Sequence, residues 1–166
     1  RDFHAEKPNQ KWFTDITEFA IPSGKVYLSP IIDCFDGMVV KWNIGTAPDS
    51  ILVNKMLEDA IGTLSTSEQP LVHTDRGCHY RWAGWIKRME AAELTRSMSK
   101  KGCSSDNTTC ERFFGRLKNE MFYGRSWIGV SNEINDYITW YNTKRIKQSL
   151  GYMSPVEYRH NLGLTA

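Results

Sequence analysis

The chain has 166 residues, of which 40% are hydrophobic and 24% are charged, so its composition is that of an ordinary soluble domain and excludes disordered, collagen-like and disulfide-rich classes. No apolar run approaches the ~20 residues that a membrane-spanning helix needs. Residues 1–75 carry six basic and eleven acidic side chains, whereas residues 76–166 carry fifteen and eight. This asymmetry indicates a polyanionic partner for the second part of the chain, or ordinary variation in surface charge.

Three strand-like runs come first in chain order. They cover residues 11–19, 25–35 and 38–44, and turn residues at Ser23-Gly24 and Asp36-Gly37 separate them. An Asp-Gly pair between two β-rich runs is a strong hairpin signal. The pattern therefore predicts an antiparallel meander at the start of the chain.

Helices and short strands alternate after this meander. Pro48-Asp49 begins a helical pattern, in which hydrophobic residues recur at three- and four-residue spacing as far as Leu64. The elements predicted next are a strand over 70–75, a helix over 81–92, a strand over 93–99, helices over 106–122 and 131–144, and a short final helix opened by Ser154-Pro155. The order βββ-α-β-α-β-α-α predicts an α/β fold with helices on the faces of a mixed sheet.

The cysteines and histidines give no metal-binding pattern. Cys34, Cys78, Cys103 and Cys110 lack the spacing of a zinc knuckle, so we expect reduced thiols. His73 lies in a predicted strand, where we expect it to pack or to support the site rather than to bind a metal.

Three acidic residues lie at positions in the predicted elements where a functional role would explain the carboxylate. Asp15 lies within a β-rich run, where burying an unpaired acid is costly. Asp75 ends the strand over 70–75, and sites in open α/β sheets form at the carboxyl ends of strands. Glu111 lies in the first turns of the long predicted helix. The three can converge if this helix packs across the sheet.

The long helix over 106–122 has two distinct faces. Its core stripe consists of Cys110, Phe113, Phe114, Leu117 and Met121. Asn107, Glu111 and Lys118 share a second face, about a quarter turn away. This face suits a metal and phosphate site, and it is equally well explained as a solvated edge.

Converging carboxylates would define the chemistry of such a site, because they repel one another unless cations neutralise them. Hard oxygen ligands without thiolates favour Mg²⁺ or Mn²⁺ over zinc. Two such ions, about 3.5–4 Å apart, can clamp a scissile phosphate, activate a water or 3′-hydroxyl and stabilise the leaving oxygen. Phosphoryl transfer needs mainly positioning and neutralisation of charge, which fits a site without an obvious nucleophilic side chain.

The spacing of the acids and the sequences around them resemble a known family. Thirty-five residues separate Asp75 from Glu111, and with Asp15 upstream this resembles the D,D(35)E signature of retroviral integrases and related insertion-sequence transposases. The segments that also resemble bacterial transposases with an integrase-type core are WFTDIT, HTDRGCHY, SMSKKGCSSDN, CERFFGRLKNE and YNTKRIKQSLGYMSPVEY. The resemblance runs from Trp12 to Tyr158, nearly the whole chain.

The resemblance implies a fold, a site and an activity. The fold would be RNase H-like, with a five-stranded mixed β-sheet of order 3-2-1-4-5 flanked by α-helices. Asp15, Asp75 and Glu111 would be the catalytic metal ligands for Mg²⁺, with Mn²⁺ as a substitute and two ions when DNA is bound. The activity would be cleavage at transposon ends and strand transfer of the 3′-hydroxyl into target DNA, without a covalent enzyme intermediate.

The expected DNA surface surrounds the helix that carries Glu111. The resemblance implies that Lys118 approaches the cleaved phosphate and that Asn107 lies beside the metals or the DNA backbone. Other residues that could contact phosphates are Arg76, Arg81, Lys87, Arg88, Lys100, Lys101, Arg112, Arg116, Lys144, Arg145 and Lys147. Of these, the residues we favour are Arg76, Lys100, Lys101, Arg112, Lys144 and Arg145. Each is equally well explained as a solvated surface charge.

The chain also departs from the family pattern. Thr108 replaces a common small Ala, and Lys147 occupies a place often held by His. The usual N-terminal helix-turn-helix portion is missing and Arg1 is an unusual first residue, so we expect a catalytic core alone. Residues 1–10 would form a lead-in and residues 11–160 the integrase core, in which 128–160 is a C-terminal helical extension. We expect a homo-oligomer when active, no membrane contact, and a location in the bacterial cytoplasm at the nucleoid.

Two other functions stay open. The first is a related RNase H-like metal nuclease, such as a ribonuclease H or a resolvase. Such a nuclease shares the fold but lacks the quoted sequence segments from Asp75 to Glu111. The second is a non-catalytic DNA-binding fragment, which the intact acid triad argues against. Substrate preference and metal binding distinguish the three.

Overall fold

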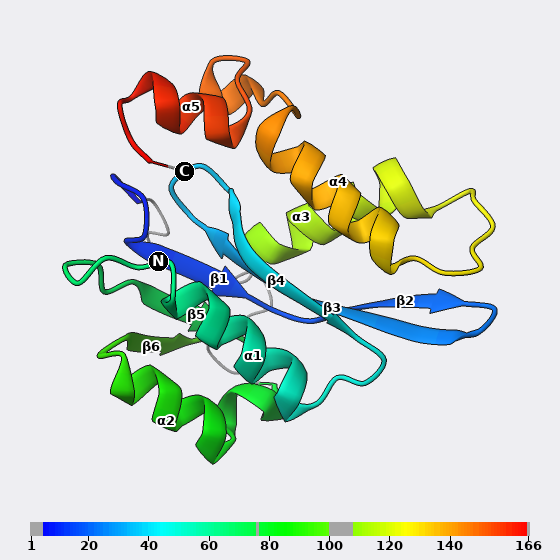
Figure 1. Ribbon diagram of the computed structural model, residues 1–166, viewed down its shortest axis with the longest axis horizontal. Helices are drawn as coiled ribbons and strands as arrows, with labels where there is room; N and C mark the ends of the chain where they lie inside the picture. The colour runs from blue at the N-terminus through cyan, green and yellow to red at the C-terminus, as the bar shows by residue number, and fades with distance from the viewer. Residues whose placement is uncertain (1–4, 76, 100–107, 166) are drawn as a thin grey trace.

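The computed structural model describes residues 5–75, 77–99 and 108–165 (Figure 1). Its strands are β1 (Lys11–Thr14), β2 (Thr17–Ile21), β3 (Gly24–Asp33), β4 (Val39–Gly45), β5 (Leu71–Thr74) and β6 (Thr95–Met98). Its α-helices are α1 (Ser50–Ile61), α2 (Ala83–Ala91), α3 (Thr108–Leu117), α4 (Ser131–Thr143) and α5 (Pro155–Asn161). Short 3₁₀ turns η1 (Cys78–Arg81) and η4 (Gln148–Leu150) precede α2 and α5, and the π-helical turn η3 (Lys118–Phe122) continues α3. The predicted sequence of elements is confirmed.

The sheet has the predicted mixed topology. β3 pairs antiparallel with β1, β2 and β4, while β5 pairs parallel with β1 and with β6. Because β1 and β2 both lie along β3, on the side away from β4, they are two parts of one interrupted strand. Counted as one strand, they give the order β4-β3-β1/β2-β5-β6, which is the predicted order 3-2-1-4-5.

The interruption between β1 and β2 is the main difference from the expected strands. The run over 11–19 was predicted to be continuous, but it breaks at Asp15 and Ile16. The Ile16 amide donates to the Asp15 carboxylate, Oδ1, at 2.8 Å. A short acidic side chain that captures a neighbouring amide in this way competes with the hydrogen bonds of the sheet.

Helices cover both faces of the sheet, as Figure 1 shows. Successive side chains of a strand point to opposite faces. Trp12 of β1 therefore packs with α1 and α2, in a cluster with Val53, Met56 and Trp85. Phe13, the next residue, packs on the other face with the side chains of α3 and α4. This arrangement holds α3 across the sheet, as the sequence argument about Glu111 requires.

The last helix, α5, is fixed to the sheet by buried charges. Ser154 caps it through a reciprocal pair of hydrogen bonds with Glu157, as the Ser154-Pro155 pair predicted. Arg159 donates to Asp33 at 2.9 Å and to Asp36 at 2.6 Å, and the three side chains are 3% exposed or less. The C-terminal helix therefore closes on the loop between β3 and β4.

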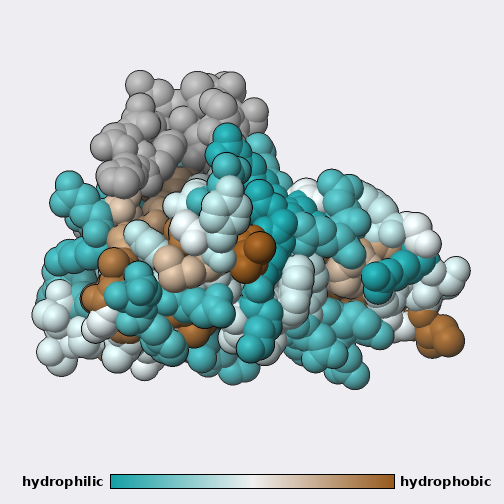
Figure 2. Space-filling model, turned by 90° about the horizontal axis from the view of Figure 1, so that it is seen from above, coloured by the Kyte–Doolittle hydropathy of each residue, from teal (hydrophilic) through white to brown (hydrophobic). Residues whose placement is uncertain are grey.

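Several predicted features lie outside the described residues: the loop over 100–107, with Lys100, Lys101, Cys103 and Asn107, and also Arg76. Cys34, Cys78 and Cys110 carry free thiols. Within the described ranges, no helix is both long and apolar enough to cross a membrane. Figure 2 shows that the described surface seen from above is mostly hydrophilic, with hydrophobic residues in small separate spots.

Candidate active site

Asp15 and Asp75 lie side by side at the carboxyl ends of two neighbouring strands. β1 and β5 run parallel, and Thr14 is paired with Thr74. The two aspartates are the next residues of their chains, and both are half-buried. Because neighbouring strands are about 4.8 Å apart, this register brings the two carboxylates to one edge of the sheet.

Main-chain amides orient both carboxylates. Ile16 donates to Asp15 Oδ1 at 2.8 Å, and Gly77 donates to Asp75 Oδ1 at 2.7 Å. A Cβ atom on residue 77 would lie only 2.8 Å from the same Asp75 oxygen, so any other residue here would force this carboxylate to shift. Among the described residues, Asp75 Oδ2 makes no hydrogen bond, which leaves this oxygen for a ligand.

Glu111 lies in the first turn of α3 and is exposed. The preceding residue, Cys110, is fully buried. Burial raises the pKa of the Cys110 thiol, and the negative charges of Asp15, Asp75 and Glu111 raise it further. The negative charges of all three acids thus reach the same buried thiol, next to Glu111 in the chain.

The donor set fits a magnesium or manganese ion, since three carboxylates supply hard oxygen ligands. However, no three His, Cys, Asp or Glu side chains of the described ranges form a group that could hold a metal ion. The acids thus share a neighbourhood, but they do not form a closed coordination shell in this structure.

Comparisons with known proteins identify the family of the chain. Two family models, both described as Integrase core domain, match residues 5–104 and 111–162. The chain belongs to the integrase core domain family. The catalytic core domain of an HTLV-2 integrase, solved in complex with magnesium, has a similar structure, with a TM-score of 0.71 at 19% identity over 90% of this chain and 95% of that chain. The predicted RNase H-like fold is confirmed.

The relatives of this integrase core are insertion-sequence transposases. It is 62% identical over 169 residues to the probable transposase for insertion sequence element IS1353 of Shigella flexneri, matching 99% of this chain and 33% of the relative. It is 39% identical to the putative transposase InsK for insertion sequence element IS150 of Escherichia coli K12, matching 96% of this chain and 58% of the relative. The chain thus spans about a third to three fifths of the length of these relatives.

His73 of this integrase core has the packing role that the sequence favoured. It is buried in β5, and its ring lies 5.1 Å from the Phe13 ring. Its two ring nitrogens lie 2.9 Å from the Ser97 hydroxyl and 3.1 Å from the Ser99 hydroxyl. Hydroxyl groups thus occupy both positions through which the imidazole would bind a metal.

The basic residues considered for DNA binding lie in different parts of the structure and have different partners. Arg88 pairs with Glu58 of α1 at 2.7 Å, on the opposite face of the sheet from α3. Arg145 is held by Glu120, with its Nε 2.9 and 3.1 Å from the two carboxylate oxygens. The Lys118 amine lies 5.4 Å from the Phe19 ring centre, and burial lowers its pKa.

Sequence reasoning did not find that four of the basic side chains gather at one cavity. Arg112, Arg116, Arg145 and Lys147 line a space of about 500 Å³ between α3, the loop after β3 and the segment before α5. Arg112 and Arg116, four residues apart on α3, could have indicated a shared face. Nothing in the sequence places Lys147 beside them.

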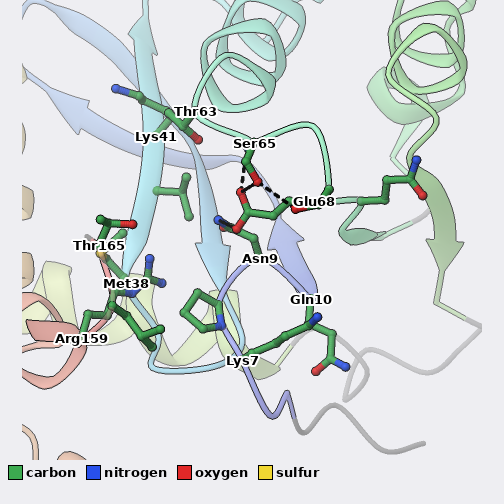
Figure 3. Close-up of a pocket in the computed structure, with 15 residues that line it drawn as sticks. Lys7, Asn9, Gln10, Met38, Lys41, Thr63, Ser65, Glu68, Arg159 and Thr165 are labelled. Carbon is green, nitrogen blue, oxygen red and sulfur yellow. Dashed lines mark hydrogen bonds between the residues drawn. The ribbon is translucent and has the colours of Figure 1, made fainter. Parts of the chain in front are cut away.

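A second cavity, of about 750 Å³, lies beside the opposite end of β1 (Figure 3). Asn9 donates to Glu68 there at 2.8 Å, and Glu68 also accepts from Ser65. These bonds tie the segment before β1 to the loop after α1. The acidic triad does not line this cavity, so its size does not mark the active site.

Proposed function

We propose that this integrase core cleaves DNA at transposon ends and transfers the 3′-hydroxyl into target DNA. The observation that carries the proposal is the position of Asp15 and Asp75 at the ends of paired parallel strands, with Glu111 on the helix that packs against the same sheet. The transposase relatives support the same activity. Because the chain spans only part of their length, the complete reaction is part of the proposal.

Asp15, Asp75 and Glu111 would hold Mg²⁺, with Mn²⁺ as a substitute and two ions when DNA is bound. The solved HTLV-2 integrase core is described as a complex with magnesium, which supports this choice. A bound ion would polarise the scissile phosphate as a Lewis acid. The chain's own contribution is to fix the two aspartates by main-chain amides, while Glu111, exposed on the first turn of α3, would supply the third carboxylate.

DNA binding would use mainly basic residues, of which Arg76, Lys100 and Lys101, together with the amide of Asn107, lie outside the described residues. The proposed contacts are Lys118, Asn107, Arg76, Lys100, Lys101, Arg112, Lys144 and Arg145. We place the core at residues 11–160, with 128–160 as its C-terminal extension. Solved trimeric and dimeric forms of an HTLV-2 integrase core support a homo-oligomer when active. Its DNA substrate places its action at the nucleoid of the bacterial cytoplasm.

Replacing Asp75 tests the proposal. Asp75→Asn keeps the size and the Oδ1 acceptor of the side chain but removes a charged metal ligand. We expect metal-dependent cleavage and joining to fall by about a thousandfold or more, which corresponds to several kcal/mol of transition-state stabilisation. Activity is measured with oligonucleotides that carry the ends of the insertion element. Calorimetric titration with Mn²⁺ is expected to show binding by the parent chain and loss of binding by the variant.

The control variant is Asp59→Asn on α1, which removes an exposed acid paired with Lys55. It is expected to keep full activity and metal binding. Wild-type activity of Asp75→Asn, or absence of Mn²⁺ binding by the parent chain, would contradict the proposal. A preference for RNA–DNA hybrids or four-way junctions over transposon ends would identify a related nuclease instead.

A further inference from the structure

We propose that the cavity lined by Arg112, Arg116, Arg145 and Lys147 is a phosphate-binding site, separate from the acidic triad. This cavity, the basic pocket, lies on a different side of α3 from Glu111 and has a volume of about 500 Å³. The inference rests on the proposed function in one respect: a DNA backbone is one of the two possible sources of the phosphate.

The basic pocket has an excess of positive charge. Asp36 is the acidic residue of its lining; it shares the single cation Arg159 with Asp33, so it offsets one of the positive charges of the pocket at most. Glu120 likewise neutralises Arg145. Within the described part of the chain, no carboxylate lies within ion-pair distance of Arg112 or Arg116. The pocket therefore lacks enough acidic groups to balance its cations.

Lys147 lies among these cations. Its amine donates to the carbonyl oxygens of Asp36 and Gly37 at 2.8 and 3.2 Å. Its pKa is lowered to about 8, chiefly by burial and further by the charges of Arg116 and Arg145, although Asp36 opposes the shift. An anion in the pocket would offset the repulsion among these cations.

The hydrogen-bonding groups of the pocket suit phosphate oxygens. Thr109, Gln148 and Ser149 line the same space and carry uncharged donors. Guanidinium groups bind phosphate through paired donors, with an affinity that combines charge and geometry. The volume exceeds that of one phosphate, so a phosphodiester with part of its sugar also fits.

The position of the basic pocket relates it to the acidic site. Arg112 follows Glu111 directly on α3, so their side chains point about 100° apart around the helix. The distance across a helix with its side chains is about 10–12 Å. A phosphate in the pocket would thus anchor a nucleic-acid strand at a fixed short distance from the acids, without contacting them.

The test is DNA binding by the double variant Arg112→Gln/Arg116→Gln. Binding of a fluorescent duplex is measured by anisotropy in EDTA, over a range of salt concentrations, so that metal-dependent catalysis does not enter. We expect affinity to fall several-fold and the salt-dependence slope to decrease in magnitude by about 0.9 for each phosphate that the variant no longer neutralises. The matched control is Lys7→Gln/Lys55→Gln, which removes two exposed cations from the segment before β1 and from α1.

Two further measurements sharpen the outcome. Arg112→Lys/Arg116→Lys, which keeps the charge, is expected to restore most of the salt slope. Inorganic phosphate is also titrated while thermal unfolding is followed. If phosphate stabilises the parent chain but not the Gln double variant, and the two proteins bind DNA equally well, the site binds free phosphate rather than DNA. Equal behaviour of the Gln variant and its control towards both ligands overturns the proposal. Because binding is measured in EDTA, its outcome does not depend on metal bound by the acidic triad, which keeps this test independent of the catalytic one.

Discussion

At the scale of single residues, Lys147 shows how surroundings rather than sequence set the properties of a side chain. The sequence marked it as a lysine at a place where the family often has histidine, and as one of many basic residues that could contact phosphates. In the structure its amine lies 4.6 Å from the Tyr141 ring centre and contacts two carbonyl oxygens. Its neighbours Arg116, Arg145 and Asp36 come from three different parts of the chain, so no local pattern could predict its lowered pKa.

This lowered pKa predicts a pH-dependent stability. Between pH 8 and 10.5 the unfolded chain keeps the Lys147 proton while the folded chain releases it, so stability rises with pH in this window. Relative to Lys147→Met, the free energy of unfolding of the parent chain should increase by about 1–3 kcal/mol from pH 7.5 to 10.5. Urea denaturation at several pH values measures the difference. The control is Lys55→Met, at an exposed position of α1. A difference that stays constant with pH would show that burial does not disfavour the charged amine.

At the scale of elements, α5 was predicted correctly, but the interaction that holds it was not. The Ser154-Pro155 start is a local signal. Arg159 meets Asp33 and Asp36 across 126 and 123 residues of sequence, a separation at which residue patterns carry no information.

The helix that carries Glu111 was also predicted only in part. Its hydrophobic spacing predicted a single α-helix, but from Lys118 it continues as a π-turn, in which the Tyr123 amide bonds to the Lys118 carbonyl at 2.8 Å.

The buried charges of α5 predict a large effect of removing its arginine. Arg159→Met leaves Asp33 and Asp36 buried without their cation, and such a loss costs about 3–5 kcal/mol. Burial already raises the pKa of Asp33, so its carboxylate tolerates further loss of charge compensation poorly. Chemical denaturation measures the change, and Arg125→Met in an exposed loop is the control. Adding Asp33→Asn and Asp36→Asn should recover part of the stability; no recovery would contradict the role given to the ion pairs.

At the scale of the whole molecule, the topology was predictable because it depends on the order of elements and on the rule that parallel strands end at one edge. Asp75 was correctly placed at a strand end on that basis, whereas Asp15 was predicted inside a continuous strand and instead follows the end of β1. The sequence did not predict that the three acids fail to form a closed metal shell in this structure, because side-chain approach depends on packing and on ligands.

Metal binding to the folded chain predicts a gain in thermal stability. At a Mg²⁺ concentration ten times the dissociation constant, the gain is about 1.4 kcal/mol. For a chain of this size the melting temperature should rise by about 3–6 °C. Differential scanning calorimetry measures the shift, and Asp75→Asn should abolish it. An equal rise in both proteins would assign the effect to metal bound elsewhere.

The pairing of Thr14 with Thr74 also determines which changes of chain length the site can accommodate. Successive strand residues face opposite sides, so one residue added within β1 or β5 would turn an aspartate away from its partner. The exposed loop between α1 and β5 has no such constraint, because its length does not alter the register. The relative position of the two carboxylates therefore depends on where each aspartate follows its strand. The number of residues between the two aspartates can vary without changing that position.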